Sequence, residues 1–424
     1  MDPKVFRHLE GEILKAVPLR RRLGWMFIGA MVWLGGGVSE TILAEEAPLA
    51  KETPPAQENH RPSVIHITDL YRPPADPDDH FDLVCAFALA KQGYIDLAAV
   101  VIEAPKPDFA GDPDVMAVAQ LNRLTGLAVP VVAGMPASVS DPWKKQSENG
   151  TPLTEWIKRA LPPVVLISTG SCRDVAQAAK ECPSELFAGK VRAVYVNAGL
   201  GSPEPAYQSP LEYNVALDPK SYQEIFSLPS PVYWLPCFEG TNTGLMWRSS
   251  RHASLYRFRQ EEVFSKLSAP VQNYFLWMLE AGSGPAGGGK QSWFWQHPTR
   301  WLRALEGPPD PDLLARHGRS WRSMWSTASQ LHAAGLTVTR DGRLVPVKEA
   351  GDSAVFDFVP VEVQCTPEGV THWRELSTER SKPAVGKPPQ FILRILDIQA
   401  YPTAMTRTLG NLLQGLVDRG PVSR

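Results

Sequence analysis

A dense group of carboxylates marks the segment 68–83, TDLYRPPADPDDHFDL, which lies between the apolar runs SVIHI and VCAFALA. Five aspartates fall within fourteen positions there: Asp69, Asp76, Asp78, Asp79 and Asp82. Carboxylates at close range raise one another's pKa and repel, so such a cluster requires a cation, hydrogen-bond donors or free access to water. Two interpretations follow: a metal site, or a solvated turn that caps the helix expected at 79–92, where Asp is favoured.

Oxygen ligands recur after two later apolar runs. Thr169 follows the run at 164–168, and Glu212 and Asn214 come after the run at 191–196. Together with the aspartates, these positions offer oxygens and amides without a His or Cys. Such a set selects a hard cation, and Ca²⁺, which accepts about six to eight oxygens including carbonyls and waters, fits it better than Zn²⁺. The pattern indicates Ca²⁺ as the cofactor and favours a site over a capping turn.

Elements of an α/β fold must position these residues. Short runs rich in Val and Ile alternate with helix-like stretches: the runs are 64–68, 97–102, 129–133, 164–168, 191–196 and 231–235, and the helical stretches are 79–92, 112–125, 171–182 and 218–227. Strands that are apolar throughout are buried on both faces, as in a mainly parallel, Rossmann-like sheet covered by helices on both faces. In such sheets ligands bind in the crevice at the carboxyl ends of the strands.

The C-terminal half is less regular. We expect a mostly helical insertion at about 245–335, whose tryptophans, including Trp325, are interpreted mainly as packing residues. The alternating segment 354–365 predicts a late strand, 390–398 another strand, and 403–418 a helix. These elements complete one folded domain that we expect to span residues 63–424.

The N-terminus predicts export. Arg20 to Arg22 precede the apolar stretch 23–38, and the small residue Ala44 follows, which is typical of a cleaved signal peptide. An uncleaved membrane anchor through 23–38 is the alternative, because the leader is long for a signal while the apolar stretch is short for a span. Residues 1–44 are therefore a signal peptide or anchor, and the polar, Pro-rich residues 45–62 a linker.

Composition limits the classes of function. The formal net charge of -2 and a pI near 6.5 provide no basic field, so we expect no nucleic-acid partner. The five cysteines include no CxxC pair, which excludes a zinc knuckle. In an exported chain Cys172 and Cys182 could form a disulfide.

Several of these segments resemble one known family. DLYRPPADPDDHFDL, VPVVAGMP, LISTGSCRDVAQAA, VRAVYVNAGLG and LEYNVALDPKS occur in the order and approximate spacing of the inosine-uridine preferring nucleoside hydrolases, whose opening signature is DxDPGxDD. The similarity spans residues 64 to about 240. LEYNVALDP is its strongest match, to the family's E-x-N-x-x-x-D-P segment. The chain resembles a divergent, exported member.

The resemblance implies a Ca²⁺ site and a catalytic carboxylate. Asp79 resembles the last Asp of the signature, a Ca²⁺ ligand, and Thr169 resembles the threonine whose carbonyl also binds the metal. Asp69 is the further metal ligand that we expect, with Asp76 as the alternative, because LYRPPA lengthens the loop and the signature's Gly is missing. Asp78 resembles the carboxylate that contacts ribose, and Asp78 or Asp76 would take a proton from the attacking water.

The same resemblance implies substrate contacts and shows a departure. Glu212 and Asn214 resemble the pair that binds the ribose hydroxyls, with Asn197 as a further substrate-binding residue. The family's His-Asp pair, which supplies the closing Ca²⁺ ligand and a histidine beside the leaving base, is replaced here by MWSTASQLHAAG at 324–335. Ser326 or Thr327 could bind the metal there through an oxygen without bringing a negative charge, and Trp325 can stack on a base or ring. His332 is a candidate substitute for the missing histidine, although a lone helical His is more often a packed residue.

Two hypotheses of different class follow. The first is an exported hydrolase that cleaves the N-glycosidic bond of a ribonucleoside or ribose-like substrate with a Ca²⁺-activated water. The second is a nucleoside- or sugar-binding protein on the same fold without catalysis, which the missing His-Asp pair favours. The partner in either case is a small molecule, and a homo-oligomer stays open.

Overall fold

The computed structural model describes residues 61–70, 78–104, 113–136, 151–160, 164–240, 247–282, 300–376 and 387–418. The leader or anchor predicted for 1–44, almost all of the linker 45–62, and Asp76 lie outside these residues. Within the described part of the chain, no helix is long and apolar enough to cross a membrane. Export, cleavage near Ala44 and anchoring stay predictions.

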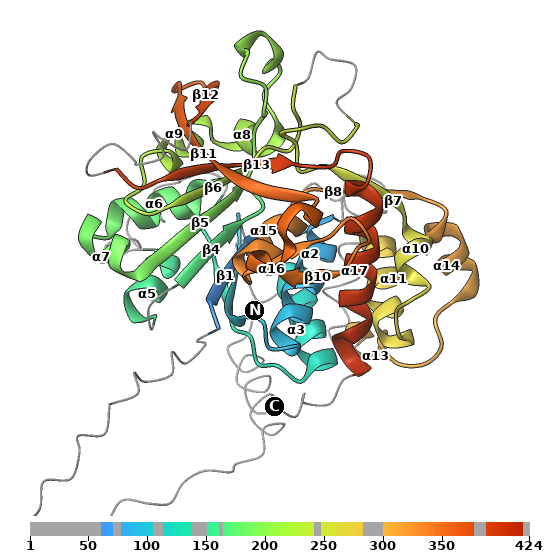
Figure 1. The fold of residues 1–424 in the computed structure, drawn as a ribbon. Coiled ribbons are helices and arrows are strands. Elements are labelled where there is room, and N and C mark those ends of the chain that lie inside the picture. Colours follow the sequence, from blue (N-terminus) through green and yellow to red (C-terminus); the bar gives the residue numbers. More distant parts are fainter. Residues whose placement is uncertain are drawn as a thin grey trace, which may run out of the picture. The chain divides into compact units, whose positions relative to one another are not determined.

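A central nine-stranded sheet organises the described residues, in the order β12-β11-β13-β6-β5-β4-β1-β2-β3 (Figure 1). Its strands are β1 (Ser63–Thr68), β2 (Asp96–Ile102), β3 (Val131–Ala133), β4 (Val164–Ser168), β5 (Val191–Asn197), β6 (Val232–Leu235), β11 (Phe356–Cys365), β12 (Thr371–Glu375) and β13 (Gln390–Ile395). β11 pairs antiparallel with β12 and β13, and the other pairings are parallel. The predicted α/β class with a mainly parallel sheet is confirmed.

The strand order β3-β2-β1-β4-β5-β6 is that of a doubly wound, Rossmann-like sheet. From β1 the chain builds outward through β2 and β3, and it then returns to the other side of β1 with β4. The neighbouring strands β1 and β4 therefore form the topological switch point, where connections diverge and leave a crevice. Asp69 directly follows β1, and Thr169 directly follows β4.

Helices cover both faces of the sheet (Figure 1). One layer contains α2 (Asp78–Lys91), α3 (Pro113–Thr125), α15 (Thr327–Ala333) and α17 (Tyr401–Asp418), and the other contains α5 (Pro152–Arg159), α6 (Arg173–Glu181), α7 (Ser184–Lys190) and α9 (Pro219–Ile225). Buried apolar residues divide into a cluster on each face, and β1 contributes Val64 to one and Ile65 and Ile67 to the other. Burial on both faces explains why these strands show no polar alternation.

Residues 245–335 are less purely helical than expected. They include α10 (Gln260–Phe264), α11 (Ala269–Gly282), α13 (Arg300–Arg303) and α14 (Pro311–Gly318). They also hold a small antiparallel sheet of β7 (Tyr256–Arg259) and β8 (Trp321–Met324), which the sequence analysis missed because each strand has only four residues. α15 packs against α2 and β5, so the end of this region belongs to the main α/β body.

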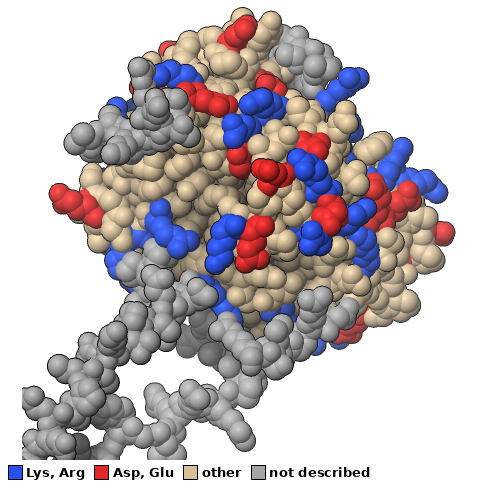
Figure 2. Space-filling view, in the orientation of Figure 1, with Lys and Arg blue, Asp and Glu red and all other residues tan. Residues whose placement is uncertain are grey.

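The remaining elements lie around this body. They are α8 (Tyr213–Leu217), α16 (Val347–Ala350) and the two-stranded sheet of β9 (Leu336–Val338) and β10 (Leu344–Pro346). On the face of the molecule drawn in Figure 2, acidic and basic side chains are interspersed. That face therefore presents no large field of one sign.

The disulfide considered between Cys172 and Cys182 is wrong, because both thiols are free and they flank α6 at its opposite ends. A helix of nine residues is about 13 Å long at 1.5 Å per residue. Disulfides need Cα atoms within about 7 Å. The helix thus holds the two thiols too far apart to bond.

Candidate functional site

A cavity of about 420 Å³ opens at the carboxyl ends of the central strands, beside the switch point. Small-ligand sites commonly occupy about 300–1,000 Å³. The cavity wall brings together the predicted site residues that the structure describes: Asp69, Asp78, Asp79, Thr169, Asn197, Glu212, Asn214 and Trp325. Asp76 lies outside the described residues, so its role is untested.

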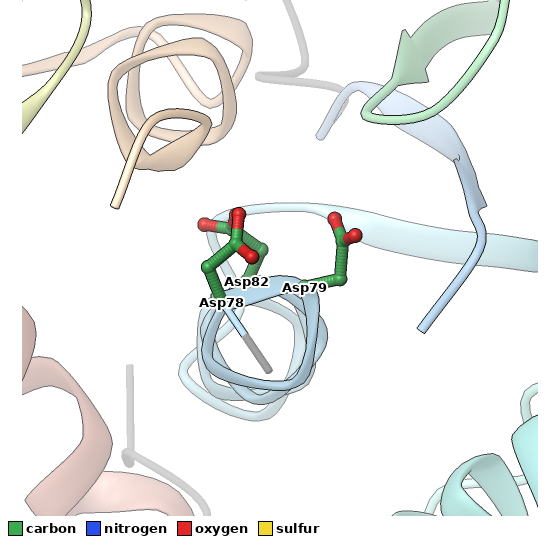
Figure 3. Close-up of side chains that lie close together, drawn as sticks. All are labelled: Asp78, Asp79 and Asp82. Carbon is green, nitrogen blue, oxygen red and sulfur yellow. The ribbon is translucent and has the colours of Figure 1, made fainter. Parts of the chain in front are cut away.

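The β1–α2 junction supplies the carboxylates. α2 begins at Asp78, so its first turn presents Asp78 and Asp79, and Asp82 follows one turn later. Figure 3 shows all three side chains on the same side of α2, and each offers a carboxylate oxygen within 4.8 Å of the others. Asp69, Asp79 and Asp82 are buried, with 4%, 7% and 0% of their surface exposed. A freely solvated capping turn is therefore wrong for this cluster.

Electrostatic repulsion within this group is strong. Burial raises the pKa of Asp69 well above its ordinary value, and the charges of Asp79 and Glu103 raise it further. Asp69 and Asp79 also share a hydrogen bond between their carboxyl groups, which requires a proton on one of them. Burial, and then the charge of Asp79, raise the pKa of Asp82. A cation bound among these oxygens would lower the pKa of each of these carboxyl groups.

The β4–α6 turn supplies the carbonyl of Thr169. The backbone N–H and the hydroxyl of Thr169 both donate to the Ile67 carbonyl oxygen, at 3.0 and 3.2 Å, and these two hydrogen bonds hold the turn against β1. The Thr169 carbonyl accepts from Asn214 Nδ2 at 3.0 Å. A carbonyl oxygen has two lone pairs, so this contact leaves one for a further ligand.

Glu103 was missed by the sequence analysis, although it directly follows the apolar run at 97–102 and so met the rule used for the other strands. It is 1% exposed and accepts from Ser171 N at 2.6 Å and from Arg173 Nη2 at 3.0 Å. This buried ion pair fixes the turn that carries Thr169. Glu103 thus supports the site from behind, without lining the cavity.

Glu212 has a structural role that the motif did not indicate. It is the N-cap of α8, and its carboxylate accepts from Gly199 N at 2.8 Å, Asn214 N at 3.0 Å and Val215 N at 3.3 Å. Burial raises the pKa of Glu212, and these backbone donors oppose that rise. About four lone-pair sites exist on a carboxylate, so these contacts leave little capacity for a sugar hydroxyl.

The two asparagines are held by the protein itself. Asn214 Nδ2 donates to the carbonyl oxygens of Thr169 and Asn197, at 3.0 and 3.1 Å, which leaves its Oδ1 as the acceptor for a ligand. Asn197 is 2% exposed, and its amide donates to the Leu235 carbonyl at 2.8 Å and accepts from the Ser326 hydroxyl. Asn197 therefore positions Ser326.

Aromatic rings form the remaining wall. Phe238 lies edge-on to Trp247 and to Trp325, with ring centroids 5.3 and 5.8 Å apart. Trp247 is 52% exposed and Trp325 is 8% exposed, so the wall runs from the mouth of the cavity to its interior. Cys237 lies beside them in the wall. Phe238 and Cys237 follow β6, a strand exit at which the sequence predicted no site residue.

His332 does not substitute for a catalytic histidine. Its ring packs among Tyr195, Tyr233 and Phe358, and its Nδ1 pairs with the Tyr195 hydroxyl at 2.8 Å. Burial lowers the pKa of His332 to about 4. It is not among the residues that line the cavity, so the packed interpretation is confirmed and the catalytic one is wrong.

The residues present fit a hard divalent cation. Asp69, Asp79 and the Thr169 carbonyl offer oxygens around one cavity, and Asp82 has a buried carboxylate oxygen without a partner in the described part of the chain. Buried carboxylates at this density are costly unless a positive charge compensates them. Oxygen ligands alone suit Ca²⁺ or Mg²⁺ rather than a soft metal.

Comparison with known proteins finds likeness in structure only. No protein-family model matches the chain, and no curated protein sequence matches it. A plant nucleoside hydrolase, PpNRh1, is 13% identical with a TM-score of 0.46, over 82% of this chain and 98% of that chain. An inosine-uridine preferring nucleoside hydrolase from Bacillus anthracis is 12% identical with a TM-score of 0.41, over 82% and 99%.

The type III effector protein XopQ, solved with adenosine diphosphate ribose, is 14% identical with a TM-score of 0.49, over 85% of this chain and 95% of that chain. Identities this low and TM-scores below 0.5 carry no argument about activity. Membership of the inosine-uridine preferring family stays a prediction, and the case for function depends on the site itself.

Proposed function

We propose that the protein is a hydrolase that cleaves the N-glycosidic bond of a ribonucleoside or ribose-like substrate. The observation that carries the proposal is the meeting of Asp69 after β1, Asp79 on α2 and Thr169 after β4 around one cavity at the switch point. A capping turn alone would not require carboxylates and a carbonyl from two strand exits. Buried, mutually repelling acids in a small-molecule cavity usually perform chemistry.

Asp69, Asp79 and the Thr169 carbonyl would hold Ca²⁺. When bound, the cation would lower the pKa of a water molecule, so that hydroxide becomes accessible near neutral pH. Asp69 and Asp79 would then be ionised, because the shared proton that links their carboxyl groups would give way to the positive charge.

Asp78 is the carboxylate that would accept the proton from water. It is only half-buried and lines the cavity, in contrast with the deeper Asp79 and Asp82. Greater contact with solvent lets its carboxylate release the proton after each turnover. General-base catalysis of this kind contributes about 10²- to 10⁴-fold.

The sugar would be held on the β5 side of the cavity. Asn214 Oδ1 is available to a hydroxyl because its amide hydrogens are already used, and Glu212 has little remaining acceptor capacity. Asn197 acts indirectly, through its contacts with Ser326 and with Asn214. Hydrogen bonds that strengthen as charge builds on the ribose ring favour the transition state.

The leaving group would lie against Phe238, Trp247 and Trp325. Planar rings stack on such faces, and pairs of aromatic rings contribute about 0.5–1.5 kcal/mol beyond their buried area. The described part of this wall contains no His, Asp or Glu. The proposal therefore assigns these rings binding and the exclusion of water, and not proton transfer.

Incubation with inosine, uridine and p-nitrophenyl riboside in the presence of Ca²⁺ tests this function. We expect release of base or nitrophenol by the wild-type protein and a loss of at least about 100-fold in kcat/KM for Asp79→Asn. Asp357→Asn, at a carboxylate that pairs with Arg394 on β13, is the matched control and should stay active. Absence of turnover, together with absence of bound metal, would contradict the proposal.

A binding role without catalysis is the second candidate. The protein's own groups occupy most of Glu212 and all of the Asn197 side chain, and the described aromatic wall has no His, Asp or Glu. Such a site can hold a ring and a sugar without cleaving the bond between them. Calorimetry separates the candidates, because ribose or inosine binding that persists without product formation supports the binding role.

A further inference from the structure

Asp82 has no role in the function proposed above, although it is the most deeply buried of the three clustered aspartates on α2. It is fully buried, and one of its carboxylate oxygens lies within 4.8 Å of oxygens of both Asp78 and Asp79. Figure 3 shows the three carboxylates on the same side of the helix. A buried charge of this kind requires a compensating partner.

One oxygen of Asp82 has such a partner and the other has none. Thr327 Oγ1 donates to Asp82 Oδ1 at 3.4 Å, and Thr327 itself pairs with the Tyr256 hydroxyl at 2.9 Å. Asp82 Oδ2 is buried and has no hydrogen-bond partner among the described residues. When Asp82 is ionised, this oxygen therefore has no donor to compensate its charge.

Ser326 brings a second oxygen to the same place. Its hydroxyl donates its single proton to Asn197 Oδ1, whose orientation is fixed because Asn197 Nδ2 donates to the Leu235 carbonyl at 2.8 Å. Ser326 also forms a hydrogen bond with the Asp82 carboxylate. A hydroxyl has a single proton, so Ser326 cannot satisfy Asn197 Oδ1 and Asp82 at the same time. The acceptors at this place therefore outnumber the donors, and a cation would supply the missing positive charge.

We propose that Asp82 Oδ2 and Ser326 Oγ are ligands that close the divalent cation site from the α15 side, opposite Asp69 and Thr169. The inference rests on the proposed function, because it adds two ligands to the same cation. Asp78 and Asp79, in the first turn of α2, each offer a carboxylate oxygen within 4.8 Å of one from Asp82. Carboxylate and hydroxyl oxygens are ligands that Ca²⁺ accepts.

Calorimetric titration of the full chain with CaCl₂, after removal of metal by a chelator, tests the inference. We expect Asp82→Asn to weaken Ca²⁺ binding by about 10- to 100-fold, as the loss of a partner in a metal site does. Asp174→Asn is the matched control, because it also removes a buried carboxylate and its Oδ1 can keep the hydrogen bond from Met135 N. The control should leave the Ca²⁺ affinity close to that of the wild type.

A second test moves the negative charge from residue 82 to residue 326. Asp82→Asn combined with Ser326→Asp places a carboxylate at the neighbouring residue that precedes α15, and we expect it to restore most of the lost Ca²⁺ affinity. In chelator, Asp82→Asn should melt at the same or a higher temperature than the wild type, because the amide removes a buried acid. A merely structural role of Asp82 would instead lower the melting temperature and would not be rescued.

The outcomes separate this inference from the proposed function. Wild-type affinity in Asp82→Asn, alongside lost binding in Asp79→Asn, overturns the role of Asp82 and leaves the cation in place. Lost binding in both variants without hydrolysis of any nucleoside supports the inference and overturns the hydrolase. If the wild type binds no Ca²⁺, both fall.

A variant that fails to fold does not leave the question open. If Asp82→Asn does not fold, the single variant Ser326→Asp tests the inference instead. Ca²⁺ binding tighter by at least about tenfold supports a cation between these two positions. Unchanged or weaker binding overturns the inference.

Discussion

At the scale of single residues, the site consists mainly of acidic side chains, and they differ in burial and therefore in role. Asp78 is half-buried at the cavity, whereas Asp69, Asp79 and Asp82 are buried. Arg173 is the basic side chain that pairs with Glu103 behind the Thr169 turn, and it does not line the cavity. The negative charge that faces the ligand is therefore left for a cation to balance.

Asp78→Asn should remove catalysis and keep binding. The amide cannot accept a proton from water, so we expect kcat to fall by about 10²- to 10⁴-fold at saturating Ca²⁺. Ca²⁺ affinity should change far less than in Asp79→Asn. Steady-state kinetics and calorimetry on the same preparation check this, and a kcat within about threefold of wild type would remove Asp78 from the mechanism.

Asp174→Asn should change the pH dependence of stability. Burial, and then the charge of Glu103, raise the pKa of Asp174 from 3.8 to about 7. Between these values the folded state holds a proton that the unfolded state has lost, so the free energy of unfolding decreases as pH rises through this window.

Asn does not titrate, so the variant should lack this decrease. Relative to wild type, its free energy of unfolding should rise by up to roughly 4 kcal/mol between about pH 4 and pH 8. Urea unfolding in chelator at several pH values measures the difference. Parallel curves for the two proteins would show that Asp174 does not titrate in this range.

Residue types predicted the carboxylate group and its partners at other strand exits, and the structure places the described members around one cavity. The individual contacts of these residues could not be predicted from the sequence. Glu103 acquires its role from Ser171 and Arg173, which are 68 and 70 positions away in the chain. Glu212 acts as a helix cap through backbone groups that no motif displays. His332 was expected to be a packed residue, but its aromatic partners could not be named, because they come from three different strands.

At the scale of elements, the β4–α6 turn is the most constrained part of the site. A Cβ on Gly170 would lie 2.1 Å from Glu103 Oε2 and 3.3 Å from Asp69 Cγ. Glu103 cannot move aside without breaking its contacts with Ser171 and Arg173. The absence of a side chain at residue 170 thus lets the turn lie against two carboxylates.

Gly170→Ala should therefore destabilise the protein by roughly 1–3 kcal/mol and weaken Ca²⁺ binding. Gly189→Ala is the matched control, because nothing lies within 4 Å of its Cβ and it is part of α7. Ala is favoured over Gly inside a helix by about 0.5–1 kcal/mol, so the control should be slightly more stable. Chemical denaturation measures both, and equal stabilities would argue against this packing.

Element types were predictable wherever a strand was apolar throughout. Each of the six expected strands of the parallel sheet is present, and the helices at 79–92 and 112–125 differ from α2 and α3 by one residue at most. The short pairs β7–β8 and β9–β10 were missed because three or four residues show no periodicity. Tertiary pairing defines such strands, and local sequence does not.

At the scale of the whole molecule, strand order determines where chemistry can occur. The order β3-β2-β1-β4-β5-β6 makes β1 and β4 neighbours, so residues 69 and 169 meet although 100 positions separate them. The sequence predicted a parallel sheet and a crevice without fixing this order. The meeting of the two exits is a property of the topology.

Export is the prediction that belongs to the whole chain. We propose that the mature protein starts near residue 45, because Arg20 to Arg22, the apolar stretch 23–38 and Ala44 have the order of a signal peptide. Intact mass of protein recovered from the exported fraction measures this. A full-length mass in a membrane fraction would instead support the anchor.

A structure determined with calcium and ribose tests the central claim most directly. We predict one ion bonded to Asp69, Asp79 and the Thr169 carbonyl at about 2.3–2.6 Å, with the sugar against Asn214. Asp69 and Asp79 should no longer be hydrogen-bonded to each other. A cavity that stays without an ion at saturating calcium, with the two carboxyl groups still paired, would contradict the account.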